Sequence, residues 1–406
     1  MIEFPYLNEI CMETGSKIVM LVVDGLGGLP DPTTGKSELE TAHLPNLDKL
    51  AQISEAGVTT PVLPGITPGS GPGHMALFGY DPVKYLVGRG ACEALGVDIP
   101  LGPNAVAARA NFCTLDSEGK IIDRRAGRID SDKAIALVGM LGGIQGSADA
   151  SVEVHHVQSY RFVLVLRGDA LGDSLADTDP QTLGDQPLQA VPKNPQDGYA
   201  FRTAQVVNAF VKQANELLAN EEKANSLLLR GFSREPVDWP DFGKSYRLNP
   251  GAIAAYPMYR GLAKITGMTL LEAGDNFDTE LQTLENNYAN HDYFFLHYKP
   301  ADAAGEDGKF DLKVKRLEEL DSQIPRILDL HPDVLVVTGD HSSPSIMASH
   351  SWHPVPLLIK SQLSVHLGVD RFTERACSLG SLGHRSANDV MILALAHGEK
   401  LKKFGA

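Results

Sequence analysis

Acidic residues and one histidine follow three apolar segments of the chain, at positions where they could bind a divalent metal ion. They are Asp24 after segment 17–23, Asp302 after segment 292–298, and the pair Asp340-His341 after segment 333–338. A single aspartate after a strand is most often a loop residue that accepts backbone hydrogen bonds. Three such positions, one of them followed by a histidine, favour a metal site. Carboxylate and imidazole ligands together suit Mn²⁺, Zn²⁺ or Mg²⁺.

A further nitrogen ligand could come from segment 349–356, which follows the third acidic position. This segment contains both His350 and His353. Residue type alone makes the two histidines equally eligible, so the sequence leaves this choice open.

Ser70 lies in a segment dense in glycine and proline, directly before a run that is compatible with a helix. A serine at a helix N-terminus faces free N–H donors and the positive end of the helix dipole, which suits an anion or a developing alkoxide. Serine is also a frequent helix cap, so position alone leaves both roles open. Beside a metal ion, which lowers the pKa of a hydroxyl group, Ser70 becomes a candidate nucleophile. We expect His74, one turn later, to pack or to orient the loop.

Arginines are concentrated in the middle of the chain. They are Arg124, Arg125 and Arg128 in segment 123–128, with Arg89, Arg109 and Arg161 in the same part of the sequence. A short arginine run is usually a solvated surface. In an acidic protein with a candidate phosphoryl-transfer centre, we favour bidentate binding of carboxylate and phosphate by these guanidinium groups.

The elements that must position these residues are those of an α/β protein. The three apolar segments are short, rich in Val, Ile and Phe, and do not alternate with polar residues, which indicates strands buried on both faces. Helical spacing of apolar residues predicts helices over 45–56, ending at Gly57, and over 314–330, where Pro325 could divide the helix. We therefore predict a mostly parallel sheet flanked by helices, with ligands at the carboxyl ends of its strands.

The middle of the chain has a different pattern. It contains runs typical of a hairpin at 151–157 and 161–166, an amphipathic helix over 205–219, and a polar loop over 177–196. We interpret it as a smaller α+β lobe inserted into the first. The predicted domains are a metal-binding core made of 1–82 and 241–406, and an inserted substrate-binding lobe made of 83–240.

Charge and composition exclude several classes of protein. The chain has 406 residues, 36 Lys and Arg against 51 Asp and Glu, and a formal net charge of −15. An acidic surface repels phosphate backbones and anionic lipids, so we expect neither nucleic acid nor a membrane as a partner. The four cysteines include no CxxC pair, and no apolar run approaches the roughly 20 residues of a membrane-spanning helix. We expect a cytoplasmic protein with more than one lobe.

Several motifs, in this order and over nearly the whole chain, resemble the archaeal-type, cofactor-independent phosphoglycerate mutases of the alkaline phosphatase-like metalloenzymes. They are Val22-Val-Asp-Gly25, Pro68-Gly-Ser70-x-x-x-His74, Gly79-Tyr-Asp-Pro82, Arg109-Ala-Asn-Phe112, Asp123-Arg-Arg-Ala-Gly-Arg128 and Gly339-Asp-His341. The Gly-Asp-His motif marks only the superfamily. The arginine motif points to the mutases.

The resemblance implies a role for each matching residue. The first metal ion would be held by Asp24, Ser70, Asp340 and His341, with Ser70 also the nucleophile that becomes phosphoserine. The second ion would be held by Asp302, His350 and the residue four positions after Asp302, which is commonly histidine in the family and is Glu306 here. The implied substrate-binding residues are Arg109, Asp123, Arg124, Arg125, Arg128, Arg161 and, as a weaker candidate, Lys264.

The implied reaction is the interconversion of 3-phosphoglycerate and 2-phosphoglycerate in glycolysis and gluconeogenesis, without bisphosphoglycerate. It would use two divalent ions, Mn²⁺ first and Mg²⁺ or Zn²⁺ as alternatives, and a small phosphorylated hydroxy acid as substrate. The sequence leaves a homo-oligomer open. The rival functions are a phosphomonoesterase or another phosphotransferase of the same superfamily, and a non-catalytic metal-binding protein. A general phosphatase has no need of an arginine-rich lobe to retain its product, which favours the mutase.

Overall fold

The computed structural model describes residues 2–147, 150–364 and 368–405. The chain forms two compact units: the first is Met1–Leu86, Trp239–Tyr256 and Thr266–Ala406, and the second is Val87–Asp238 and Pro257–Ile265. The predicted division at 82/83 and 240/241 therefore lies close to two of the points where the chain passes between the units. Segment 257–265, which we expected in the core, is part of the second unit.

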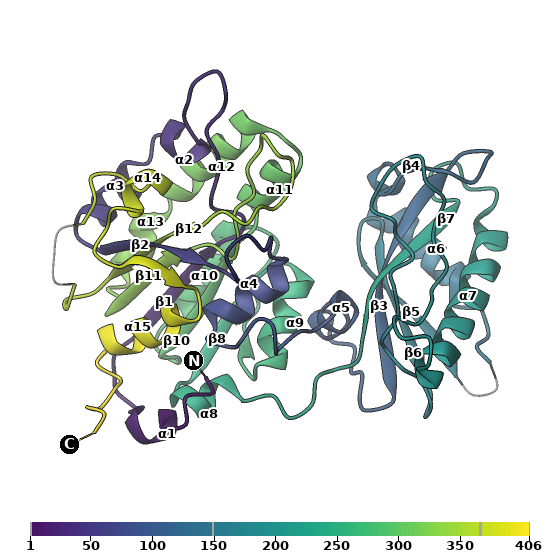
Figure 1. The fold of residues 1–406 in the computed structure, drawn as a ribbon, viewed down its shortest axis with the longest axis horizontal. Coiled ribbons are helices and arrows are strands. Elements are labelled where there is room, and N and C mark those ends of the chain that lie inside the picture. Colours follow the sequence, from purple (N-terminus) through teal and green to yellow (C-terminus); the bar gives the residue numbers. More distant parts are fainter. Residues whose placement is uncertain (1, 148–149, 365–367, 406) are drawn as a thin grey trace. The chain divides into compact units, whose positions relative to one another are not determined.

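The first unit is built on a sheet of eight strands among the described residues (Figure 1). In spatial order they are β13 (Gly383–Ser386), β2 (Glu55–Thr60), β12 (Val355–Lys360), β11 (Val334–Thr338), β1 (Ile18–Val23), β10 (Tyr293–Tyr298), β8 (Pro250–Ile253) and β9 (Thr269–Leu270). Only β12 runs antiparallel to its neighbours; the other pairs are parallel. Every residue of β1, β10 and β11 is buried, as their uninterrupted apolar sequences predict.

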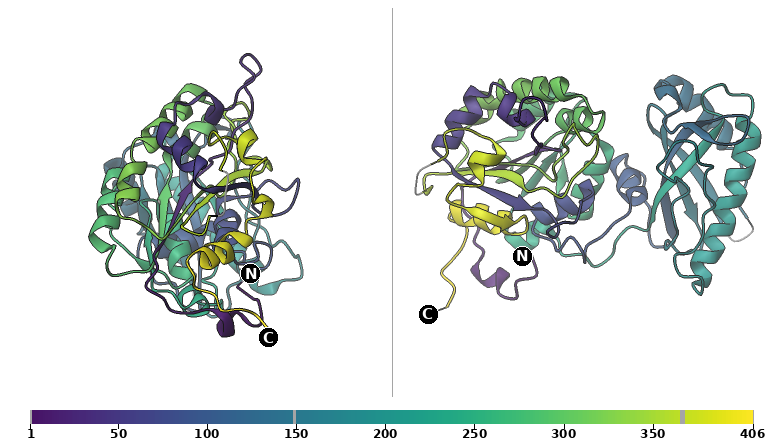
Figure 2. Two further views of the ribbon diagram at one scale, coloured as in Figure 1. Left: turned by 90° about the vertical axis from the view of Figure 1, so that its left-hand side faces the viewer. Right: turned by 45° about the horizontal axis from the view of Figure 1, so that its top comes forward.

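Helices cover both faces of this sheet (Figures 1 and 2). The helices of this unit are α1 (Leu7–Ile10), α2 (Glu38–Thr41), α3 (Pro45–Gln52), α4 (Ser70–Leu77), α8 (Phe242–Tyr246), α10 (Phe277–Asn287), α11 (Pro300–Glu306), α12 (Phe310–Asp321), α13 (Ile324–Asp329), α14 (Glu374–Cys377) and α15 (Asp389–His397). Val19, Leu21 and Val23 of β1 share one apolar core with Leu47 of α3 and Leu317 of α12. The predicted α/β fold with a mostly parallel, helix-flanked sheet is confirmed.

Two predicted helices differ from the observed ones at their ends. The helix expected over 45–56 ends at Gln52, and residues from Glu55 onward form β2. The pairing of β2 with β12 and β13 stabilises a strand at the end of the segment where the spacing of apolar residues predicted a helix. The helix expected over 314–330 is divided into α12 and α13, and Pro325 stands in the first turn of α13, where its missing N–H costs no hydrogen bond.

The second unit is an antiparallel sheet with helices, as an α+β lobe requires. Its strands are β3 (Ala105–Leu115), β4 (Ile121–Asp123), β5 (Ser151–Gln158), β6 (Arg161–Arg167) and β7 (Ser226–Ser233). Its helices are α5 (Arg89–Gly96), the 3-10 turn η1 (Ala126–Arg128), α6 (Ser131–Leu141), α7 (Gly198–Leu218) and α9 (Pro257–Ile265). The predicted hairpin is the β5–β6 pair, and the helix predicted over 205–219 begins earlier, at Gly198. Across the described ranges, no helix combines the length and the apolar character needed to cross a membrane.

A buried carboxyl group makes the stability of the first unit sensitive to pH. Glu280 of α10 is 4% exposed and accepts a hydrogen bond from the Ala255 N–H at 2.9 Å. Burial disfavours its charge and, despite this hydrogen bond, raises the pKa of Glu280 from 4.5 to about 8. The folded protein therefore keeps a proton on Glu280 at pH values where the unfolded chain has released it.

We expect Glu280→Gln to remove a loss of stability that occurs as the pH rises from about 4.5 to about 8. The difference in the free energy of unfolding between variant and wild type should be more favourable to the variant at pH 8 than at pH 4.5, by on the order of 1–3 kcal/mol. Urea unfolding at both pH values measures the gain, with exposed Glu272→Gln as the control. An equal stability difference at the two pH values would show that Glu280 does not carry this dependence.

Candidate active site

The ends of three neighbouring strands bring the predicted acidic residues together. Asp24 follows β1 directly, Asp302 lies in α11 after β10, and Asp340 follows β11 by two residues. Because β1 pairs with both β10 and β11 in parallel, all three strands end at the same edge of the sheet. The three side chains are at most 1% exposed.

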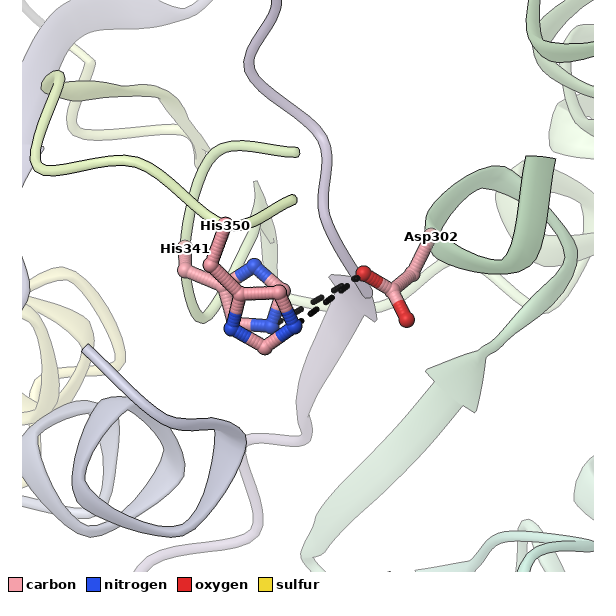
Figure 3. Close-up of side chains that lie close together, drawn as sticks. All are labelled: Asp302, His341 and His350. Carbon is pink, nitrogen blue, oxygen red and sulfur yellow. Dashed lines mark ion pairs between the residues drawn. The ribbon is translucent and has the colours of Figure 1, made fainter. Parts of the chain in front are cut away.

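His341 lies at the centre of this group. Its Nε2 atom is 3.3 Å from Asp24 Oδ1, 3.2 Å from Asp340 Oδ2 and 3.3 Å from Ser70 Oγ. Asp24, Asp340 and His341 offer ligand atoms that all lie within 4.8 Å of one another. A second set with the same property consists of Asp302, His341 and His350, drawn in Figure 3.

His350 is oriented by the loop that precedes the candidate nucleophile. Its Nδ1–H donates to the Pro68 carbonyl oxygen at 3.0 Å, so Nε2 faces the acidic residues. This nitrogen is 3.6 Å from Asp302 Oδ1 and 3.4 Å from Glu306 Oε1. The ring stacks on His341, with 3.6 Å between the ring centroids (Figure 3).

Of the two histidines that the sequence left open, His350 lies in a candidate ligand set and His353 lies in neither. Its Nδ1 atom is 3.1 Å from Ser351 Oγ, and its ring stacks on the indole of Trp352.

The surroundings of Asp24 favour its charged form. Burial opposes ionisation of Asp24, but Lys299, His297 and His341 outweigh it and hold the pKa of Asp24 well below its usual value. Burial also opposes the charge of His350, yet its contacts with Glu306 and Asp302 raise the pKa of His350 to about 9. Without a metal ion His350 therefore holds a proton, which an ion bound at Nε2 would displace.

Ser70 lies at the start of a helix but is not its cap. It is the first residue of α4, where Gly69 is the N-cap, and its hydroxyl is turned to His341. The residue is 3% exposed. His74, one turn later, has Nδ1 2.8 Å from the Ser70 carbonyl oxygen and 3.2 Å from Asp340 Oδ2. These contacts agree with an orienting role for His74.

Glu306 lies one helical turn after Asp302 on α11, so the two carboxylates leave the helix on the same side. Its side chain is 42% exposed, and its Oε1 atom lies 3.4 Å from His350 Nε2. Neither ligand set includes Glu306. Its ligation of a metal ion therefore stays a prediction.

The donor set fits divalent ions. Three carboxylates, two imidazoles and one hydroxyl converge on a small buried volume, and these are the oxygen and nitrogen donors that Mn²⁺, Mg²⁺ and Zn²⁺ accept. The four cysteines are all buried and are absent from both ligand sets, so the group offers no thiolate that would favour a soft ion.

Three residues that sequence reasoning missed complete the group. Lys299 Nζ donates to Asp24 Oδ2 at 2.9 Å, and His297 Nε2 lies 3.2 Å from the same oxygen. Ser343 Oγ donates to Asp302 Oδ1 at 2.6 Å. Lys299 stands one helical turn before Asp302 and Ser343 two residues after His341, and this proximity in the sequence is the signal that could have identified both.

A buried lysine joins the loops that carry the group. Lys313 of α12 is fully buried, and its Nζ donates to the Gly27 carbonyl at 3.0 Å and to the Ser343 carbonyl at 2.9 Å. Glu38 Oε1 lies 3.9 Å from the same nitrogen and accepts the N–H of Ser345 at 2.7 Å. The ammonium group of Lys313 thus links the loop after β1 to the loop after β11.

In the second unit, two arginines meet a buried aspartate. Arg124 donates from Nε and Nη2 to Asp179 at 3.0 and 2.6 Å, and Arg230 of β7 lies 3.8 Å from the same carboxylate. Arg230 is paired in register with Arg109 of β3. Burial and the nearby charges of Arg89 and Arg109 lower the pKa of Arg230. Arg230, which sequence reasoning did not select, therefore belongs to this concentration of positive charge.

The remaining predicted substrate residues are placed around this sheet. Asp123 accepts the N–H groups of Arg125 and Gly127 at 2.7 and 2.6 Å, so its carboxylate shapes the turn that carries the arginine motif. Arg128, in that turn, is exposed. Arg161 of β6 lies over the ring of Tyr160, 5.0 Å from its centroid.

Arg109 is 7% exposed, and its Nε atom is 3.5 Å from Glu93 of α5. Lys264 of α9 forms an ion pair with Asp98, beyond the end of α5. The structure therefore groups Lys264 with α5 rather than with the arginine motif.

A family model and two related sequences point to the same family of proteins. A family model described as 2,3-bisphosphoglycerate-independent phosphoglycerate mutase matches residues 51–224. The chain is 47% identical to a probable 2,3-bisphosphoglycerate-independent phosphoglycerate mutase of Thermus thermophilus, covering 99% of both chains. It is also 47% identical to the corresponding protein of Thermotoga maritima, covering 99% of this chain and 98% of the other.

Two solved structures are similar to this chain over nearly its whole length. The PH0037 protein of Pyrococcus horikoshii superposes with a TM-score of 0.80 at 28% identity, covering 96% of this chain and 99% of the other. The cofactor-independent phosphoglycerate mutase of Thermoplasma acidophilum gives a TM-score of 0.63 at 28% identity, covering 94% of this chain and 100% of the other. The chain thus belongs to the 2,3-bisphosphoglycerate-independent phosphoglycerate mutases, isomerases that act as intramolecular phosphotransferases.

Proposed function

We propose that the protein interconverts 3-phosphoglycerate and 2-phosphoglycerate through a phosphoserine at Ser70, with two divalent ions, in glycolysis and gluconeogenesis in the cytoplasm. The observation that carries the proposal is the buried Ser70 hydroxyl, 3.3 Å from the nitrogen of His341 that faces Asp24 and Asp340. We assign the ion-binding role to the first unit and substrate binding to the second.

In this proposal Asp24, Asp340, His341 and Ser70 hold one ion, and Asp302, His350 and Glu306 hold the other. Bound ions would lower the pKa of the Ser70 hydroxyl and neutralise charge on the phosphoryl oxygens. Mn²⁺ is the ion we favour, with Mg²⁺ and Zn²⁺ as alternatives, because the donor set is rich in carboxylate oxygen.

The chain's own residues account for the transfer of the phosphoryl group. Ser70 Oγ attacks phosphorus and loses its proton, the bond from phosphorus to the glycerate oxygen breaks, and that oxygen takes up one proton in its place. The retained glycerate presents its other hydroxyl group, whose oxygen attacks the phosphoserine and restores Ser70. His74 holds the Ser70 backbone during both steps. The reaction is balanced without water and without a second phosphate donor.

Retention of glycerate requires positive charge, which the second unit supplies. We propose that Arg109, Asp123, Arg124, Arg125, Arg128 and Arg161 bind the substrate, with a lesser contribution from Lys264. The buried Arg109 and the pair formed by Arg124 with Asp179 support this role, since charged hydrogen bonds shielded from water are stronger than exposed ones.

Ser70→Ala should abolish turnover, because it removes the oxygen that would carry the phosphoryl group, and the loss should be several orders of magnitude in rate. Purified protein is incubated with 3-phosphoglycerate and Mn²⁺, and 2-phosphoglycerate and free phosphate are followed by phosphorus NMR. Ser378→Ala, an exposed serine of the same unit, is the control and should remain active. Wild-type-like formation of 2-phosphoglycerate by Ser70→Ala would contradict the proposal, and phosphate as the main wild-type product would favour a phosphatase.

Arg125→Ala should weaken substrate binding by about 2 kcal/mol or more if its charge pairs with the glycerate carboxylate in a closed site, and should raise the fraction of free phosphate. Arg124→Ala should act in the same direction, but it also leaves the buried Asp179 without its bidentate partner, so thermal unfolding is measured in parallel. Arg202→Ala, on the exposed side of α7, is the control. If both variants keep the wild-type KM and product ratio, the motif is a solvated surface.

Glu306→Gln should lower metal occupancy at the second position, because a neutral amide is a weaker ligand than a carboxylate. Glu306→His should shift the preference from Mn²⁺ or Mg²⁺ toward Zn²⁺, a softer ion. Metal content and metal-dependent activity are compared with wild type and with Asp311→Asn, which changes an exposed carboxylate in α12. Unchanged stoichiometry and preference in both Glu306 variants would place this side chain outside the coordination sphere.

A further inference from the structure

Lys299 joins the two ligand sets. It follows β10 and is the N-cap residue of α11. Its ammonium group donates one hydrogen bond to Asp24 Oδ2 at 2.9 Å and another to Asp302 Oδ2 at 2.5 Å. Asp24 belongs to one ligand set and Asp302 to the other. A single cation therefore bridges the two.

The second oxygen of each carboxylate faces the other way. Asp302 Oδ1 is 3.6 Å from His350 Nε2 (Figure 3). Asp24 Oδ1 is 3.3 Å from His341 Nε2. Each aspartate thus presents Oδ2 to Lys299 and Oδ1 to a histidine of the ligand sets, and His297 also lies beside Asp24 Oδ2. With both Oδ2 atoms bound to one ammonium group, rotation of either carboxylate is restricted.

The setting makes this bridge stronger than an ordinary surface ion pair. Asp24 and Asp302 are at most 1% exposed, whereas the Lys299 side chain is 30% exposed. The two carboxylates therefore lie in surroundings of low dielectric, where hydrogen bonds to a cation are strong. Partners of this kind, which orient metal ligands without touching the ion, commonly change metal affinity by about 10- to 100-fold when removed.

We propose that Lys299 is a positioning residue that fixes Asp24 and Asp302 for metal binding and so links the two ion positions. The inference rests on the proposed function, because it requires that these two carboxylates bind ions. The competing interpretation is that Lys299 occupies the place of an ion and is expelled when metal binds. The two interpretations predict opposite changes in affinity.

Lys299→Met keeps most of the length of the side chain and removes both hydrogen bonds. Metal-free protein is titrated with Mn²⁺, and free Mn²⁺ is counted by electron paramagnetic resonance, which reports binding independently of turnover. We expect binding of both ions to weaken by about 10- to 100-fold. Lys299→Arg, whose planar guanidinium can donate to two carboxylates, should restore most of the affinity. Lys244→Met, with a side chain that is 87% exposed, should match wild type.

The outcomes separate this inference from the proposed function. Thermal unfolding establishes that each variant is folded at the temperature of the titration. Unchanged or tighter Mn²⁺ binding by Lys299→Met, with two ions bound by wild type, would overturn the positioning role and leave the proposed function standing. Failure of wild type to bind Mn²⁺ would instead contradict the proposed function, and with it the inference.

Discussion

The mutual repulsion of three buried carboxylates is the constraint on which the first unit depends. Asp24, Asp302 and Asp340 stand at the ends of adjacent strands and are almost completely withdrawn from water. Buried like charges raise one another's pKa unless cations or hydrogen bonds oppose the effect. Lys299, His297 and His341 oppose the effect at Asp24, and His341 and His74 oppose it at Asp340, so the pKa of each of these two carboxyl groups lies below its usual value. The mostly parallel sheet is what brings the three together.

The acidic residues are held in place by hydrogen bonds between the loops that carry them as well as by nearby positive charges. The loops after β1 and β11 are tied by the ammonium group of Lys313, which donates to a carbonyl oxygen in each. A buried lysine is costly unless it is paired and hydrogen-bonded, and Glu38 provides the opposite charge. His74 adds a further tie, between the backbone of Ser70 and Asp340. Ser70 and the candidate ligands are thereby joined through hydrogen bonds and ion pairs.

The sequence predicts this site well where its signals are local. Buried strands followed by acidic residues locate Asp24, Asp302 and Asp340, and glycine-rich surroundings locate Ser70. Contacts between distant segments leave no such signal. The pairing of Arg124 with Asp179, and the end of α3 at Gln52 where β2 begins, depend on tertiary packing. The orientation of His350 toward Asp302 likewise depends on a hydrogen bond to the carbonyl oxygen of Pro68, which belongs to another loop.

The antiparallel direction of β12 determines how close together in the sequence several residues of the site lie. A parallel partner of β11 would require a crossover that carries the chain to the opposite edge of the sheet. Because β12 runs back along β11, the connection 339–354 never leaves the edge where the strands end. Asp340, His341, Ser343 and His350 therefore come from one continuous stretch of chain. Four residues of the site are thus contributed by a single hairpin connection, and bringing these residues together costs little loop-closure entropy.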